Sequence, residues 1–327
     1  MRILVTGGAG FAGHHLVEHL MKNTDWDIVV VDKLNYASTG WSRLRDVDVF
    51  DHDRITTLSC DFTSPITVGV AQEIGEVDYI VHMGAETHVD KSIENPIPFV
   101  MSNVVGTMMI LEYARKLKCL RKLLYFSTDE IFGPASDEVR YKEWDRYNSA
   151  NPYAASKAGG EELCMAYANT YGLPIVVTHT MNIFGERQHP EKFIPLVVKK
   201  VLAGDLVEIH SDSTKKISGS RFWIHARNVA SAVLFLLDKG AHREKYNIVG
   251  SEEVSNLGMA KAVSLIIGKE LNYKMVDFHT SRPGHDLRYA LDGDRIKQMG
   301  FKYPRDFSES LRKTVQWTLD NRHWLSV

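Results

Sequence analysis

Short apolar runs and longer segments with helical spacing alternate along the first half of the chain. The runs of apolar and β-branched residues that predict buried strands are 2–6, 28–31, 79–82, 122–127 and 175–180. The segments between them with the length of helices are 13–22, 104–117 and 156–171. Strands that alternate with helices are typical of βαβ units, in which helices cover a parallel sheet. The pattern predicts an α/β fold with a doubly wound, parallel Rossmann-type sheet.

The regular alternation weakens after about residue 180, and this change predicts the domain organisation. Segments 211–220 and 281–285 have the Ser, Gly, Pro and Lys content of loops. We expect residues 1–180 to form the Rossmann domain, and residues 181–327 to form mainly a smaller substrate-binding lobe, with interleaved boundaries. A chain of 327 residues is long enough for two such units.

Charge and hydropathy exclude several classes of partner. The 39 Lys and Arg residues nearly balance the 41 Asp and Glu residues, so no overall field attracts nucleic acid or a membrane surface. The N-terminal apolar run is too short for a signal peptide, and we identify no stretch long enough to span a bilayer. We therefore expect a cytoplasmic protein without a nucleic-acid or membrane partner.

Neither the cysteines nor the adjacent histidines predict a metal site. Cys60, Cys119 and Cys164 are scattered without CxxC spacing, so they predict buried thiols rather than a disulfide framework or a zinc site. His14 and His15 would point about 100° apart on a helix and are poorly placed to share one ion.

A glycine-rich turn follows the first strand. Gly7, Gly10 and Gly13 have the spacing GxxGxxG, which lets the backbone approach a pyrophosphate at a helix N-terminus. Glycines at such turns often have only a structural role, but Asp32 follows the second strand where a carboxylate would bind the adenosine ribose. A turn-forming aspartate is the alternative. Since a carboxylate repels a 2′-phosphate and Lys33 is the only adjacent base, the pattern favours NAD over NADP.

Tyr153 and Lys157 are spaced to share one face of a helix that begins near Pro152. A free tyrosine, with a pKa near 10, is a poor base at neutral pH. We expect the positive charges of Lys157 and of the oxidised nicotinamide to lower that pKa, so that Tyr153 can take a hydroxyl proton. A packed tyrosine beside a solvated lysine is the alternative, because YxxxK is a common pattern.

Thr128, Asp129 and Glu130 follow the strand 122–127, at the edge where open α/β sheets bind ligands. Side chains alternate along a strand, so all three reach one pocket only if regular pleating ends by Thr128. An exposed acidic loop is the alternative. Because the three motifs occur in βαβ order, we expect them to form one site.

These motifs resemble those of the extended short-chain dehydrogenase/reductases, a superfamily of NAD(P)-dependent enzymes that act largely on nucleotide sugars. Within it, the dTDP-glucose 4,6-dehydratase family is similar over nearly the whole chain. The segments with the strongest similarity are 82–96, 127–130, 190–195 and 282–286. The aspartate and glutamate beside the threonine distinguish dehydratases from simple epimerases, and Thr128, Asp129, Glu130, Tyr153 and Lys157 occupy all five matching catalytic positions.

The resemblance implies a reaction in three stages. Tyr153 takes the proton of the C4 hydroxyl as hydride passes to NAD, and the resulting ketone acidifies the C5 hydrogen. Glu130 removes that hydrogen, protonated Asp129 donates to the leaving C6 hydroxyl, and hydride returns to C6 as a proton returns to C5. The product is a 4-keto-6-deoxy sugar nucleotide, and NAD acts catalytically.

The resemblance also implies the ligand contacts of an NAD-binding domain and a nucleoside diphosphate sugar site. The expected cofactor-binding residues are Gly7, Gly10, Phe11, Ala12, Gly13, Asp32, Lys33, Asp61, Phe62, Met83, Ala85, Ser102, Tyr153 and Lys157. The expected substrate-binding residues are Thr87, Asn182, Lys192, Arg221, Asn256 and Arg288. Each arginine could alternatively form a surface ion pair. A homodimer through helices 104–117 and 156–171 is implied as well.

Several positions depart from the family pattern on the substrate side. These are Gly84, Thr87, Phe132, Phe184, Leu287 and the long segment 211–220. They leave open whether the sugar carries dTDP, UDP or CDP. An epimerase or decarboxylase would begin with the same C4 oxidation, but Glu130 argues against both. A non-catalytic NAD-binding sensor would need neither Tyr153 nor the carboxyl pair.

Overall fold

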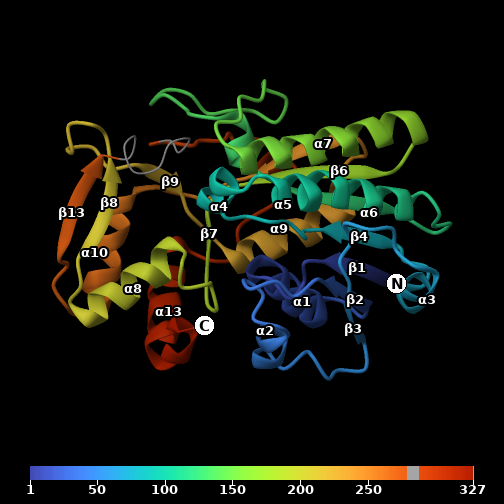
Figure 1. Cartoon of the computed structure of the whole chain (residues 1–327), viewed down its shortest axis with the longest axis horizontal. Coiled ribbons are helices and arrows are strands. Elements are labelled where there is room, and N and C mark those ends of the chain that lie inside the picture. The colour runs from blue at the N-terminus through green and yellow to red at the C-terminus, as the bar shows by residue number, and fades with distance from the viewer. Residues whose placement is uncertain (278–286, 327) are drawn as a thin grey trace.

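A seven-stranded parallel sheet forms the centre of the computed structural model, which describes residues 1–277 and 287–326 (Figure 1). Its spatial order is β11 (Glu244–Ile248), β6 (Ile175–Thr180), β5 (Lys122–Thr128), β4 (Tyr79–His82), β1 (Arg2–Thr6), β2 (Asp27–Asp32) and β3 (Ile55–Ser59). The chain reverses its direction of winding between β1 and β4, as in Rossmann-type sheets. The predicted α/β class and doubly wound parallel sheet are therefore confirmed.

Helices cover both faces of this sheet, because successive strand residues point to opposite sides. Ile3 and Val5 belong to a core shared with α1 and α9, whereas Leu4 belongs to the core under α6 and α7. The helices of this half are α1 (Phe11–Asn23), α2 (Ser42–Asp46), α3 (Val68–Ile74), α4 (Val89–Glu94), α5 (Ile97–Val100), η1 (Met101–Val105), α6 (Gly106–Ala114), η2 (Asp129–Phe132), α7 (Pro152–Tyr171), α9 (Ala226–Lys239) and α12 (Asp294–Gln298).

A smaller lobe packs beside the sheet, at the left of Figure 1. Its own core joins α8, α10 and α13 to short two-stranded sheets. The elements are β7 (Ile183–Phe184), α8 (Phe193–Ala203), β8 (Val207–Ser211), β9 (Ser220–Phe222), β10 (Ile224–His225), β12 (Glu253–Ser255), α10 (Asn256–Ile267), β13 (Tyr273–Asp277), α13 (Phe307–Asp320) and η3 (Arg322–Leu325). The predicted loop 281–285 and the family-like segment 282–286 lie outside the described residues.

The structure corrects two predictions, one about membrane-length apolar stretches and one about the burial of the cysteines. By length and composition, Ile97–Ala114 could cross a membrane, so the statement that no stretch is long enough is wrong. In this fold half of that segment is buried, and its helices pack against α7. Cys164 is buried and Cys60 partly buried, but Cys119 is exposed because it follows the end of α6.

Candidate active site

The glycine turn lies between β1 and α1 with almost no space for side chains. Gly7 has φ +72°, and a Cβ there would lie 2.7 Å from the backbone of Gly84. A Cβ on Gly13 would lie 2.1 Å from the carbonyl oxygen of Gly7. No side chain caps the N-terminus of α1 at Gly10. The turn thus presents bare backbone and a positive helix end to the cleft beside it.

Asp32 ends β2 with a buried carboxylate. Its Oδ2 accepts a hydrogen bond from Ala9 N at 3.0 Å, and its Oδ1 accepts one from Leu34 N at 2.8 Å. The side chain therefore also fixes the turn, and burial raises its pKa. The Lys33 ammonium pairs with Glu86 Oε1 at 2.5 Å, so its charge is already compensated.

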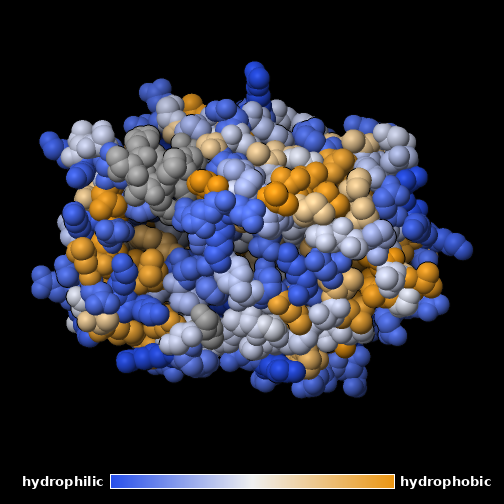
Figure 2. Space-filling view, viewed as in Figure 1, coloured by the Kyte–Doolittle hydropathy of each residue, from blue (hydrophilic) through white to orange (hydrophobic). Residues whose placement is uncertain are grey.

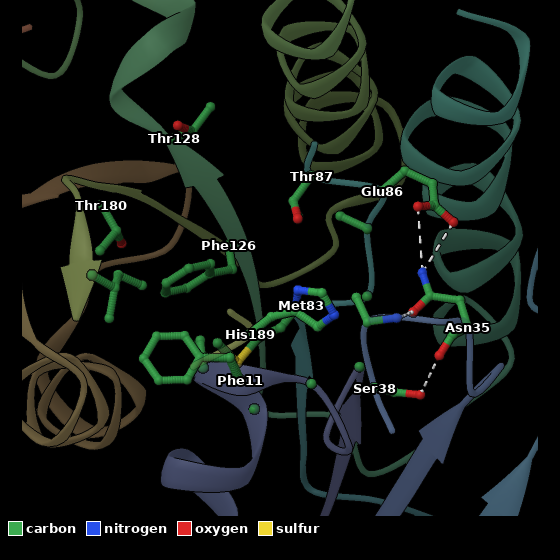
Figure 3. A pocket seen from close by; sticks show the side chains of 18 of the residues that line it. Phe11, Asn35, Ser38, Met83, Glu86, Thr87, Phe126, Thr128, Thr180 and His189 are labelled. Carbon is green, nitrogen blue, oxygen red and sulfur yellow. Dashed lines mark hydrogen bonds between the residues drawn. The ribbon is translucent and has the colours of Figure 1, made fainter. Parts of the chain in front are cut away.

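A cleft of about 330 Å³ runs along the carboxyl ends of the strands. Figure 3 shows Thr128 and Thr180 on one side of it, and Asn35 and Ser38 on the other. The predicted site residues that line it are Gly7, Gly10, Phe11, Ala12, Gly13, Asp32, Lys33, Phe62, Met83, Ala85, Thr87, Thr128, Asp129, Glu130, Tyr153, Lys157, Asn182 and Lys192. The other predicted residues, Asp61, Ser102, Arg221, Asn256 and Arg288, are not among its described lining residues.

The strand β5 passes directly into the short helix η2, which brings the carboxyl pair into the cleft. Thr128 is the last strand residue and the N-cap of η2. Its hydroxyl donates to Asp129 Oδ1 at 3.1 Å. Glu130 Oε2 accepts a hydrogen bond from Asn151 Nδ2 at 3.1 Å, and Asn151 caps α7. Regular pleating thus ends at Thr128, which is the condition for three successive side chains to reach one pocket.

Asp129 is placed to hold a proton near neutral pH. Burial, followed by the negative charge of Glu130, raises the pKa of Asp129 to about 7, although Arg221 acts against this shift. Its Oδ2 is buried and has no hydrogen-bond partner within the described part of the chain. A protonated carboxyl group in this position can donate to a bound molecule.

Tyr153 and Lys157 both face the cleft from the first turns of α7. Burial, followed by the charge of Glu130, raises the pKa of Tyr153, while its hydrogen bond with Thr128 acts in the opposite direction. Lys157 is not among the groups that lower this pKa, so the lowering expected from Lys157 together with the oxidised nicotinamide stays a prediction. The Lys157 ammonium instead donates to the Phe126 carbonyl oxygen at 2.7 Å, and burial lowers its pKa to about 8.

The two arginines predicted to bind substrate form contacts within the protein. Arg221 in β9 donates to Leu287 O at 2.7 Å, and its guanidinium lies 4.6 Å from the Tyr289 ring centre. Arg288 forms an ion pair with Glu253 at 2.6 Å. Asn256 is the first residue of α10. Substrate contacts for Arg221, Asn256 and Arg288 remain predictions.

Two other predicted residues lie outside the cleft lining. Asp61 Oδ1 accepts a hydrogen bond from Thr63 N at 2.9 Å, and Ser102 lies buried in the π-helical turn η1. Their cofactor contacts also remain predictions.

The cleft also contains polar residues that were not predicted. Glu86 accepts a hydrogen bond from Asn35 at 3.2 Å, and Glu191 lies between His189 and Lys192 with a 3.6 Å approach to each. Segments 82–96 and 190–195 carried the family resemblance, so Glu86 and Glu191 could have been proposed from it. Asn35 has only its position after Asp32 as a signal.

Three features fit a bound dinucleotide. The glycine turn admits only backbone at Gly7 and Gly13, the N-terminus of α1 is uncapped, and the Asp32 carboxylate lines the same cleft. These are the groups that bind the pyrophosphate and the ribose in a Rossmann fold.

Comparison with known proteins agrees with a dinucleotide-binding site. A model of the NAD dependent epimerase/dehydratase family matches residues 3–249. The dTDP-glucose 4,6-dehydratase of Escherichia coli is 34% identical over 351 residues, which cover 99% of this chain and 95% of that protein. The crystal structure of DesIV, a dTDP-glucose 4,6-dehydratase from Streptomyces venezuelae with NAD and TYD bound, is 35% identical with a TM-score of 0.89. That match covers 99% of this chain and 98% of DesIV.

A plant relative differs in the nucleotide that its name gives. The Arabidopsis thaliana trifunctional protein, whose name includes UDP-glucose 4,6-dehydratase, is 33% identical over 326 residues. The match covers 98% of this chain and 48% of that protein.

Proposed function

Because the chain belongs to the NAD dependent epimerase/dehydratase family, we propose that it is an NAD-dependent dTDP-glucose 4,6-dehydratase. The product would be dTDP-4-keto-6-deoxyglucose. Full-length similarity to enzymes of that name supports the proposal. The observation that carries it is the carboxyl pair of buried Asp129 and half-buried Glu130, which lines one cleft with Tyr153. A simple epimerase has no elimination step and needs no such pair.

The chain's own residues account for the proton transfers of this reaction. Bound NAD would accept hydride from C4 and return it to C6. Tyr153 would take the proton of the C4 hydroxyl, with its phenol oriented by Thr128. A ketone at C4 makes the C5 hydrogen acidic, and Glu130 would remove it. Asp129 would protonate the C6 hydroxyl, which leaves as water, while the C5 proton is held by Glu130. When hydride returns to C6, a proton would be added at C5.

Different groups of residues would hold the two ligands. The glycine turn and Asp32 would bind the pyrophosphate and ribose of NAD. Thr87, Asn182 and Lys192 line the cleft, where we propose that they contact the sugar diphosphate. We propose that Arg221, Asn256 and Arg288 bind the nucleotide portion, with a guanidinium on phosphate oxygens.

The test is direct. Purified protein, supplied with NAD, is incubated with dTDP-glucose, UDP-glucose or CDP-glucose, and mass spectrometry follows the loss of one water from the sugar. We expect the fastest loss from dTDP-glucose. Faster loss from UDP-glucose would assign the site to the chemistry named for the plant relative, and an isomer of unchanged mass would indicate an epimerase.

The proton on Asp129 predicts how elimination depends on pH. Because the protonated form is the acid and its pKa is about 7, elimination should slow as pH rises through neutrality. Asp129→Asn should slow elimination by about 100-fold, spare C4 oxidation, and remove this alkaline limb. Single-turnover measurements of water loss across this pH range, with wild type and variant, test the prediction. An unchanged rate in the variant would remove Asp129 as the acid.

We propose that the protein is a homodimer formed through the helices of segments 104–117 and 156–171. An apolar surface patch over α5, next to α6, supports this proposal and is visible in Figure 2. Ile97, Val100 and Met101 are 69%, 46% and 42% exposed.

Since half of Ile97–Ala114 is already buried within this fold, we also propose a cytoplasmic protein.

A charge placed in this patch should separate the two subunits. Met101→Glu is expected to halve the mass measured by light scattering, because an unpaired carboxylate would be buried in the contact. Leu265→Glu, at an apolar position 82% exposed on α10, is the control and should leave the mass unchanged. A Met101→Glu protein with the wild-type mass would contradict the proposed contact.

A further inference from the structure

Arg43 is a fully buried arginine on α2 that lines the cleft near Asp32. Its side chain donates hydrogen bonds to the backbone carbonyl groups of three separate segments. Nη1 donates to Ala37 O and Ser38 O at 2.8 Å each, and to Ala9 O at 3.3 Å. Nε donates to Arg187 O at 3.0 Å. One guanidinium therefore joins the glycine turn, the loop after β2 and the segment after β7.

The loop after β2 needs such support. Leu34 and Thr39 both have φ +55°, a left-handed conformation that costs free energy for residues with a Cβ. Between them, Ser38 donates from its backbone and its hydroxyl to Asn35 O, at 3.0 and 2.7 Å. Figure 3 shows Asn35 and Ser38 at the margin of the cleft. The Arg43 bonds reach this loop at its centre.

A second group of side chains connects Arg43 to the smaller lobe. Arg187 forms an ion pair with Asp46, which also belongs to α2. The guanidinium of Arg187 lies 4.6 Å from the Trp317 ring centre, and that of Arg43 lies 5.7 Å from the Trp324 ring centre. Trp317 and Trp324 belong to α13 and η3, so the contacts span both halves of the molecule.

Anchoring α2 alone does not require a buried charge. An apolar side chain of similar length would pack there without the desolvation cost of a guanidinium. The acceptors that compensate Arg43 are loop carbonyl groups. Ala37 and Ser38 line the cleft, and Ala9 and Arg187 are each adjacent in sequence to a residue that lines it. The residue therefore fixes the positions of these loops.

We propose that Arg43 is a positioning residue that holds the loops around the adenosine end of the cleft closed, so that bound NAD is retained throughout the reaction. The inference rests on the proposed function, in which one cofactor molecule must return the hydride that it accepted. Loss of these bonds would let the 34–39 loop and the 187–189 segment separate from the glycine turn, and NAD would leave more often.

The test compares NAD exchange in Arg43→Met, Arg43→Lys and the control Arg45→Met. Arg45 lies on the same helix, and its guanidinium stacks 4.3 Å from the Phe50 ring centre, outside the cleft. Holoprotein loaded with isotopically labelled NAD is mixed with excess unlabelled NAD, without sugar nucleotide, and label loss is followed. We expect Arg43→Met to exchange about 10- to 100-fold faster than wild type, the range for losing hydrogen bonds from a charged group. Arg43→Lys should be intermediate, and Arg45→Met should resemble wild type.

A steady-state measurement separates positioning from a general structural defect. In Arg43→Met, the NAD concentration for half-maximal turnover should rise, while turnover at saturating NAD returns to the wild-type range. Wild-type exchange in both Arg43 variants would overturn the proposal, and if Arg43→Met does not fold, Arg43→Lys decides. Because exchange is measured without sugar, faster exchange in a protein that does not dehydrate dTDP-glucose would refute only the proposed function.

Discussion

In Glu130→Gln, exchange of the C5 hydrogen of the substrate with solvent should fall below detection while oxidation at C4 continues. Glutamine keeps the shape of the side chain and can still bond to Asn151, which lies 3.1 Å from Glu130 Oε2. It cannot accept the C5 proton. Overall water loss should therefore fall by about 100- to 10,000-fold, the usual contribution of a general base.

Incubation in deuterium oxide, followed by mass spectrometry of recovered sugar nucleotide, measures this exchange. Cofactor reduction, followed by absorbance in a single turnover, reports C4 oxidation separately. Glu138→Gln is the control, because Glu138 is an exposed acidic residue in the loop that follows η2. Undiminished C5 exchange in Glu130→Gln would assign the base to another group.

Tyr153→Phe should slow C4 oxidation itself, by about 100- to 10,000-fold. Phenylalanine retains the buried ring but removes the phenol that would take the hydroxyl proton. It also removes the hydrogen bond with Thr128. Single-turnover cofactor reduction with dTDP-glucose measures the effect, and NAD binding should persist because the glycine turn is unchanged.

The matched control for this variant is Tyr171→Phe. Tyr171 ends the same helix and is 49% exposed, far along α7 from the cleft. It should oxidise substrate at the wild-type rate. If Tyr153→Phe oxidises C4 as fast as wild type, then the proton is taken by another residue.

Much of the sheet was predictable because its strands are apolar on both faces. Residues 2–6, 79–82 and 175–180 form strands with the predicted limits. The strand β3 was missed because its sequence contains two threonines and lies at the sheet edge. The strand β11 was missed because most of its residues are polar or charged.

The buried polar residues of β11 find partners that are distant in the sequence. The ammonium of Lys245 lies 2.9 Å from Glu161 on α7 and is almost fully buried. Asn247 accepts a hydrogen bond from the His179 ring at 2.8 Å. No local periodicity reveals such pairs, because each exists only after β11 has joined the sheet beside β6.

In the site, sequence spacing predicted where side chains lie, but not the properties that depend on their surroundings in the folded protein. Spacing brought Tyr153, Lys157 and the carboxyl pair into one cleft, since helix and strand geometry fix where these side chains point. Spacing did not give the direction of the Tyr153 pKa shift, which depends on burial and on Glu130. Nor did it identify Arg43, whose acceptors come from three separate segments.

The return of one hydride to the sugar that supplied it is tested most directly with dTDP-glucose that carries deuterium at C4. We expect the purified holoenzyme to move this deuterium to C6 of the same molecule, with one solvent hydrogen at C5 and one water lost. When the deuterated substrate also carries carbon-13 in its sugar and is mixed with unlabelled substrate, every deuterated product should also carry carbon-13, with no crossover. Deuterium that remains at C4, or that appears in a different sugar molecule, would contradict the proposed reaction.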